Sequence, residues 1–224
     1  MKAPWTILLV SATLLSAQDW RPLFNGKNLD GWEVRGDSIW TVRKDGTLVG
    51  LRPHPPGKPF GAWPVTREVY REWAGPQAWL YTKAEFDEFD LHVEYWIPPG
   101  GNSGVSIRDT SRGRWALFGP EHDSQRTPSH IGYEIQIVDG DAKYPSGSIY
   151  LFVTAKTGFE HKDDWNSLDI ESRHDMIRVR LNGESVAESP GDPKRSKTGP
   201  IGLQLHDRFS WVEFRNIRIR EIKP

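Results

Sequence analysis

Two polar side chains stand side by side in the segment GYEIQIVDG, residues 132–140. The segment alternates as a strand does, which places its apolar side chains on one face and Glu134 and Gln136 on the other. A carboxylate can act as a general base, and a carboxamide can bind sugar hydroxyls. Glu134 is therefore a candidate catalytic residue and Gln136 a candidate substrate ligand. A purely structural hydrogen-bonding role for Glu134 is the alternative.

The same strand resembles the catalytic strand of jelly-roll β-glucanases, E-I-D-I-E or its bulged form E-I-D-I-x-E. In those enzymes the first Glu is the nucleophile and the last is the acid/base. Here Gln136 replaces the middle Asp, and Val138 or, with a bulge, the shorter Asp139 takes the place of the second Glu. Retaining glycosidases need two carboxylates that flank the bond. The strand securely supplies only Glu134, so we reject that mechanism.

Three other strand-like segments also have a mixed polar face. Residues 89–97 carry Glu94 on that face, IGLQLH carries Gln204 and His206, and GVSIRD carries Arg108. When one face of an antiparallel sheet packs on a core, the other face is open. If these strands belong to one sheet, their polar side chains converge on one concave face. A plain solvated face is the alternative.

The remaining pattern indicates an all-β fold. Helix signals are few, and short strand-like runs recur between Gly, Pro, Asn and Asp, which favours a sandwich, jelly roll or barrel. Asn182-Gly183 predicts a type I′ hairpin turn. The strands predicted from these runs are 40–42, 47–49, 79–82, 89–97, 104–107, 132–138, 148–153, 176–181, 201–205 and 211–221.

Two long irregular segments interrupt the strands. Residues 51–64 contain five prolines, and residues 111–130 contain His122 and His130. Irregular segments of this length in a compact domain are usually functional lids or disordered. We expect both segments to form rims of a groove.

The N-terminal segment predicts export. Lys2, the apolar run 5–15 and Ala17 have the order of a secretory signal peptide, so we expect residues 1–17 to be removed and residues 18–224 to form a single domain. A buried N-terminal strand or helix is the alternative. No other run approaches the length of a membrane span. The chain has no cysteine, so it has no disulfide.

Net charge and composition indicate which classes of binding partner the protein has. The net charge is −1, which argues against nucleic acid or an anionic membrane surface. Eleven Trp residues favour carbohydrate slightly, because Trp stacks on sugars, although core packing is its commoner use. The seven His residues form no metal motif. Glu134, His92, Glu94 and His206 could still assemble a metal site in space.

In order along the chain, eight segments resemble the 3-keto-disaccharide hydrolase domain family, and together they cover roughly residues 20–222. No single segment is specific, but the ordered set is. The segments are LFNGKNLDGWEV, WLYTKAEFDEFDLHVEYWI, GGNSGVSIRD, GYEIQIVDG, GSIYLFV, DDWNSLDI, RVRLNGESV and GPIGLQLHDRFSWVEFRNIRI.

The resemblance implies a concanavalin A-like jelly roll of two antiparallel sheets, secretion or export to the periplasm, and action on glycosides oxidised at C3. A C3 ketone acidifies the C2 hydrogen, so one base can remove that proton and the C1 substituent can leave by elimination. Addition of water then gives net hydrolysis. This chemistry needs a base and help for the enolate oxygen, but no nucleophile.

For this chemistry we assign Glu134 as the base, His206 as acid or second base, and Arg108 as the group that holds the enolate or a hydroxyl. A surface histidine and an ion pair of Arg108 with Glu134 or Glu94 are the alternatives. A divalent metal on the ketone is possible, with unknown ligands. Non-catalytic carbohydrate binding and an adhesive sandwich are the other function classes. The expected substrate ligands are Gln136, Gln204, Asn102, Glu94 and Trp165.

Overall fold

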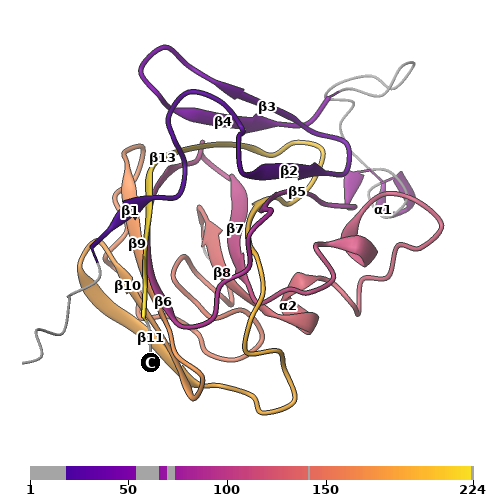
Figure 1. Cartoon of the computed structure of the whole chain (residues 1–224). Helices are drawn as coiled ribbons and strands as arrows, with labels where there is room; N and C mark the ends of the chain where they lie inside the picture. Colours follow the sequence, from indigo (N-terminus) through magenta and orange to yellow (C-terminus); the bar gives the residue numbers. More distant parts are fainter. Residues whose placement is uncertain (1–18, 54–65, 70–73, 141, 223–224) are drawn as a thin grey trace, which may run out of the picture.

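The computed structural model describes residues 19–53, 66–69, 74–140 and 142–222 (Figure 1). The expected signal peptide, residues 1–17, and most of the expected groove rim at 51–64 lie outside these ranges. None of the helices within them has the length and apolar content needed to cross a bilayer.

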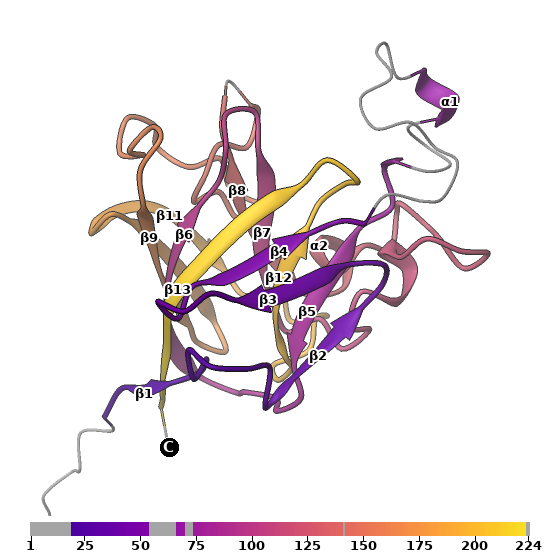
Figure 2. The same cartoon turned by 90° about the horizontal axis from the view of Figure 1, so that it is seen from above.

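Two antiparallel sheets face each other across the core, as Figures 1 and 2 show. The larger sheet has the order β11-β10-β9-β6-β13-β4-β3, with β1 paired to β13. Its strands are β1 Arg21–Pro22, β3 Ile39–Val42, β4 Leu48–Leu51, β6 Phe89–Trp96, β9 Asn166–Ser172, β10 Met176–Leu181, β11 Glu184–Pro190 and β13 Trp211–Glu221.

The smaller sheet has the order β2-β5-β12-β7-β8. Its strands are β2 Trp32–Arg35, β5 Ala78–Thr82, β7 Asn102–Ile107, β8 Tyr133–Val138 and β12 Ile201–Leu205. The short helices are α1 Arg67–Val69, the 3-10 turn η2 Arg114–Ala116 and α2 Pro128–Ile131. The segment that carries η2 and α2 connects β7 to β8 and lies on the outer side of the smaller sheet (Figure 1).

Alternation decides which face of each strand enters the core. Leu91 and Val93 of β6, Ile135 of β8 and Leu203 of β12 are completely buried between the sheets. Burial of such side chains is the main favourable term in folding. The alternating polar residues of β8 and β12 therefore lie on the outer face of the smaller sheet. The predicted two-sheet antiparallel sandwich is confirmed.

Local turn predictions had mixed outcomes. Asn182 and Gly183 have φ values of 51° and 86°, as a type I′ turn requires, and they join the paired strands β10 and β11.

The predicted strand at 148–153 is wrong. Ile149 and Val153 hydrogen-bond to each other around a tight turn in which Leu151 has a φ of 70°, so the segment folds back on itself.

Candidate active site

Glu134 is the central polar residue on the outer face of the smaller sheet. It lies on β8 opposite Ser106 of β7 and is only 4% exposed. Gln204 Nε2 of β12 donates a hydrogen bond of 2.8 Å to Glu134 Oε1. Burial raises the pKa of Glu134 to about 7, although His206 and the Gln204 hydrogen bond oppose the rise. A carboxyl with this pKa suits base catalysis near neutral pH.

Two strand glycines make room for this arrangement. A Cβ at Gly104 would lie 2.9 Å from Glu134 Oε1, and a Cβ at Gly202 would lie 2.5 Å from the Tyr81 ring. Glycine inside a strand often marks such a close approach. The Glu134 carboxylate and the Tyr81 ring can therefore lie across the strands beside them.

A buried hydrogen-bonded pair fixes the start of the segment between β7 and β8. The Tyr81 hydroxyl donates to Asp109 at 2.5 Å, and Gly113 N donates to the same Asp109 oxygen at 2.8 Å. Burial and the neighbouring Asp109 carboxylate raise the pKa of Tyr81 well above its usual value. The pair holds the turn that directs the chain outward from β7.

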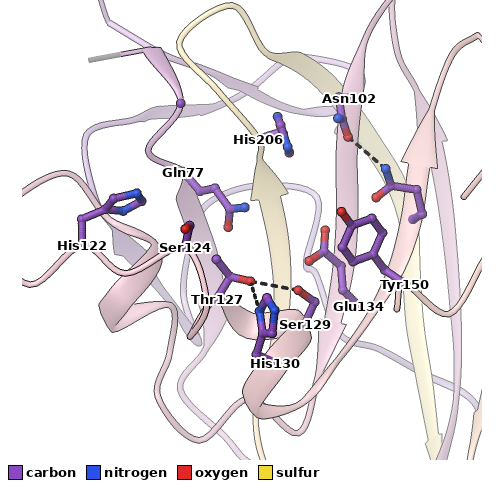
Figure 3. Close-up of a pocket in the computed structure, with 12 residues that line it drawn as sticks. Gln77, Asn102, His122, Ser124, Thr127, Ser129, His130, Glu134, Tyr150 and His206 are labelled. Atoms are coloured by element: carbon purple, nitrogen blue, oxygen red, sulfur yellow. Dashed lines mark hydrogen bonds between the residues drawn. The ribbon is translucent and has the colours of Figure 1, made fainter. Parts of the chain in front are cut away.

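This outward segment supplies one wall of a cavity (Figure 3). Thr127 Oγ1 hydrogen-bonds to His130 Nδ1 at 2.8 Å and to Ser129 Oγ at 2.9 Å. Burial, together with nearby Arg195, lowers the pKa of His130, which favours its neutral form. Within the expected rim at 111–130, the residues that line the cavity are His122, Ser124, Thr127, Ser129 and His130.

The cavity has a volume of about 510 Å³, within the range of small-molecule sites. Of the described residues that line it, Glu134 is the only carboxylate. The lining residues are Gly75, Gln77, Asn102, His122, Ser124, Thr127, Ser129, His130, Glu134, Gln136, Tyr150 and His206.

His206 follows β12 directly and reaches the cavity from the side opposite α2 (Figure 3). Its Nδ1 lies 3.3 Å from Asp207 Oδ2. Burial opposes ionisation of Asp207, but hydrogen bonds from His206, Phe209 N and Ser210 hold the pKa of Asp207 below its usual value. With Nδ1 bonded to this carboxylate, Nε2 is the His206 nitrogen available to a substrate.

The structure brings most of the predicted polar face together. Glu134, Gln136, Asn102 and His206 all line the cavity. Gln136 Nε2 lies 3.4 Å from Asn102 Oδ1 at its edge. Gln204 lies on the predicted face but has no exposed surface, so its amide contacts Glu134 and not the open cavity.

The placement of Arg108 on this face is wrong. Arg108 follows β7 with a φ of 59°, and this left-handed conformation ends the strand alternation. Its side chain is 1% exposed and donates to the Arg173 carbonyl at 2.8 Å, beyond the end of β9 in the other sheet. The guanidinium is therefore directed away from Glu134.

The placement of Glu94 and Trp165 near this site is also wrong. Glu94 lies on β6 in the larger sheet, so its open face points to the opposite side of the molecule. There it accepts a hydrogen bond of 2.6 Å from Arg215, whose guanidinium also lies 3.9 Å from the Trp165 ring centroid. The error came from assigning β6 to the sheet that carries β8.

Several lining residues were not predicted as site residues. Strand alternation does not predict Tyr150, because its segment is a turn in which Tyr150 N donates to the Glu134 carbonyl at 2.8 Å and the ring lines the cavity. Burial, together with Glu134, raises the pKa of Tyr150. Gln77 precedes β5 and carried no alternation signal. His122 and His130 lie in a long irregular segment, where no periodic pattern indicates the direction of a side chain.

The described ranges contain no group of three or more His, Cys, Asp or Glu side chains arranged to hold a metal ion. Glu134, His92, Glu94 and His206, which the sequence left open as a metal site, do not come together, because His92 and Glu94 belong to the other sheet.

Comparisons with known proteins agree with this architecture. The sequence model of the 3-keto-alpha-glucoside-1,2-lyase-like domain matches residues 19–220. A protein from Parabacteroides distasonis, provisionally assigned as a glycosyl hydrolase, is similar in structure with a TM-score of 0.65 and 21% identity, over 91% of this chain and 94% of that one. No protein with a curated description matches the chain.

Two further solved structures share the fold. The carbohydrate-binding module CBM66 from Bacillus subtilis has a TM-score of 0.54 and 15% identity, over 85% of this chain and 96% of that one. The β-glucanase of Bacillus licheniformis has a TM-score of 0.57 and 9% identity, over 93% and 100%. These similarities confirm the predicted jelly-roll class.

Proposed function

The chain belongs to the family of 3-keto-alpha-glucoside-1,2-lyase-like domains, and we propose that it cleaves the glycosidic bond of 3-keto-glycosides by elimination across C1 and C2. The observation that carries the proposal is a single carboxylate, Glu134, in a cavity otherwise lined by neutral polar groups and imidazoles among the described residues. Burial gives this carboxyl a pKa of about 7.

The single carboxylate favours elimination over double displacement. A retaining glycosidase uses two carboxyl groups about 5 Å apart, one as nucleophile and one as acid/base. Elimination needs one base, because the ketone at C3 already makes the C2 hydrogen acidic. Glu134 can supply that base without a second carboxylate.

The proposed reaction is an elimination followed by addition of water. The Glu134 carboxylate takes the C2 proton, and the electron pair of the C2–H bond forms an enolate with the C3 carbonyl. The enolate re-forms the ketone as the C1–O bond breaks, which leaves a C1–C2 double bond. The departing oxygen takes a proton from His206. Water then adds across the double bond, with its oxygen on C1, and gives the free 3-keto sugar.

The remaining cavity residues have binding roles in this proposal. The enolate oxygen needs hydrogen-bond donors, and the Arg108 guanidinium does not line the cavity but donates to the Arg173 carbonyl. The Tyr150 hydroxyl and the Gln136 amide line the cavity with Glu134 and can donate to that oxygen or to sugar hydroxyls. Asn102, beside Gln136, extends this polar surface.

Incubation with a 3-keto-glycoside and its unoxidised parent tests the function. We expect aglycone release from the oxidised compound alone, since the parent has no acidic C2 hydrogen. In deuterated water, product or recovered substrate should carry deuterium at C2, measured by mass spectrometry and NMR. Equal cleavage of both compounds would rule out elimination. Release from neither would favour a non-catalytic carbohydrate-binding domain.

We also propose that the protein is exported, to the periplasm or outside the cell, after removal of residues 1–17. The support is the order of Lys2, the apolar run 5–15 and Ala17. Mass spectrometry of protein from its native host should find a chain that begins at Gln18. Intact chain starting at Met1 in the cytosol would contradict export.

A further inference from the structure

Gln204, on β12 of the same sheet, is in direct contact with the proposed base. Its side chain has no exposed surface, and its Nε2 donates to Glu134 Oε1 at 2.8 Å. Its own Oε1 is buried and has no hydrogen-bond partner in the described part of the chain. A buried amide oxygen without a hydrogen-bond partner destabilises the folded state. Replacing Gln204 by an apolar residue therefore loses no favourable contact of this oxygen. What the glutamine provides is its N–H donor to the carboxylate.

The contact depends on a gap in the strand between the two residues. β7 lies between β12, which carries Gln204, and β8, which carries Glu134. The Glu134 carboxylate crosses β7 at Gly104, where a Cβ would lie 2.9 Å from Oε1 and 3.1 Å from Cγ. Any side chain at position 104 would therefore push the carboxylate away from the Gln204 amide.

We propose that Gln204 is a positioning residue: its amide holds the Glu134 carboxylate in the gap at Gly104 through Oε1 and leaves Oε2 free to take the substrate proton. This inference rests on the proposed function for the meaning of that proton transfer, but the contact itself can be tested without substrate.

Several charged or titratable groups face Glu134, and they act in different directions. Desolvation is the largest influence and raises the pKa of Glu134, as does Asp109 at the end of β7, whereas His206 and the Gln204 hydrogen bond lower it. Tyr81 of β5 and Tyr150, beyond β8, are also neighbours; burial is the main cause that raises the pKa of each, with Asp109 next for Tyr81 and Glu134 next for Tyr150. Loss of the Gln204 donor therefore raises the pKa of Glu134.

Gln204→Met removes the donor and keeps an unbranched side chain of similar size, and Gln204→Leu is a second variant with the same chemistry. The Glu134 carboxyl is titrated by ¹³C NMR in the folded protein without substrate. A hydrogen bond to a charged group is worth enough to move the midpoint upward by about one to two pH units. Gln136→Leu, which removes a neighbouring amide of the same sheet face, should leave the midpoint unchanged.

The same variants are assayed with a 3-keto-glycoside across pH. The acidic limb of kcat/KM should move upward with the NMR midpoint in both Gln204 variants. Gly104→Ala should lower kcat by roughly 10- to 100-fold, since small displacements of a catalytic group have effects of this size. KM should change little, because the alanine methyl group displaces the base and no substrate ligand.

The outcomes separate the two proposals. An unchanged NMR midpoint in the folded Gln204 variants would overturn the positioning role, whatever their activity. A shifted midpoint in a protein that releases no aglycone from 3-keto-glycosides would uphold the contact and contradict the proposed function. A shift of equal size in Gln136→Leu would also overturn the positioning role, because it would show that loss of any nearby amide has the effect.

Discussion

Glu134→Gln is expected to lower turnover of a 3-keto-glycoside by roughly 10²- to 10⁴-fold, the usual contribution of a general base. Glutamine has the shape of glutamate and can still accept the Gln204 hydrogen bond, but it cannot take a proton. Substrate affinity should therefore survive while kcat falls. Steady-state kinetics, with binding of the substrate to the variant measured by calorimetry, check both parts.

Glu160→Gln provides the matched control for this experiment. Glu160 is a partly buried glutamate whose pKa is also raised by burial, and it accepts hydrogen bonds from Tyr95 at 3.0 Å and from Ser146 at 2.7 Å. It does not line the cavity that contains Glu134. Its replacement should leave turnover unchanged. Normal turnover by Glu134→Gln would move the base elsewhere, with His206 as the first candidate.

The sequence correctly predicts on which face of its strand a side chain lies, because strand side chains alternate with a period of two. The face of β8 with Glu134 and the face of β12 with Gln204 both follow from this rule. Alternation cannot say which strands share a sheet, since pairing joins residues far apart in the chain. β6 has the same polar pattern but pairs with β9 and β13, so Glu94 lies on the other side of the molecule.

Other parts of the site depend on contacts that no periodic pattern records. The wall formed by Thr127 and His130 depends on the turn that Asp109 holds beside Tyr81. Gly104 interrupts a strand-like run, and a glycine inside a strand indicates a close approach by a neighbour, here the Glu134 carboxylate.

The same substitution, Glu134→Gln, is expected to stabilise the protein at alkaline pH. The folded-state pKa of about 7 lies above the usual value of 4.5, so the folded protein binds this proton more tightly than the unfolded chain does. The stabilising effect of the protonated form is complete below about pH 4.5 and is lost as the pH rises through 7. Wild type then carries a buried charge that the glutamine variant lacks.

A carboxyl with a pKa of about 7 in the folded protein and 4.5 in the unfolded chain lowers the free energy of unfolding of the wild type by on the order of 3 kcal/mol at pH 9, where Glu134 is ionised in both states. Urea unfolding at pH 5 and pH 9 measures it: the two proteins should be nearly equal at pH 5, and the variant should be more stable at pH 9. Glu121→Gln is the opposite control, because Arg114 lowers the pKa of this exposed carboxyl and its loss should not stabilise the protein at alkaline pH. If Glu134→Gln is no more stable than wild type at pH 9, ionisation of this carboxylate does not destabilise the folded protein. Its assignment as a base matched to neutral pH would then fail.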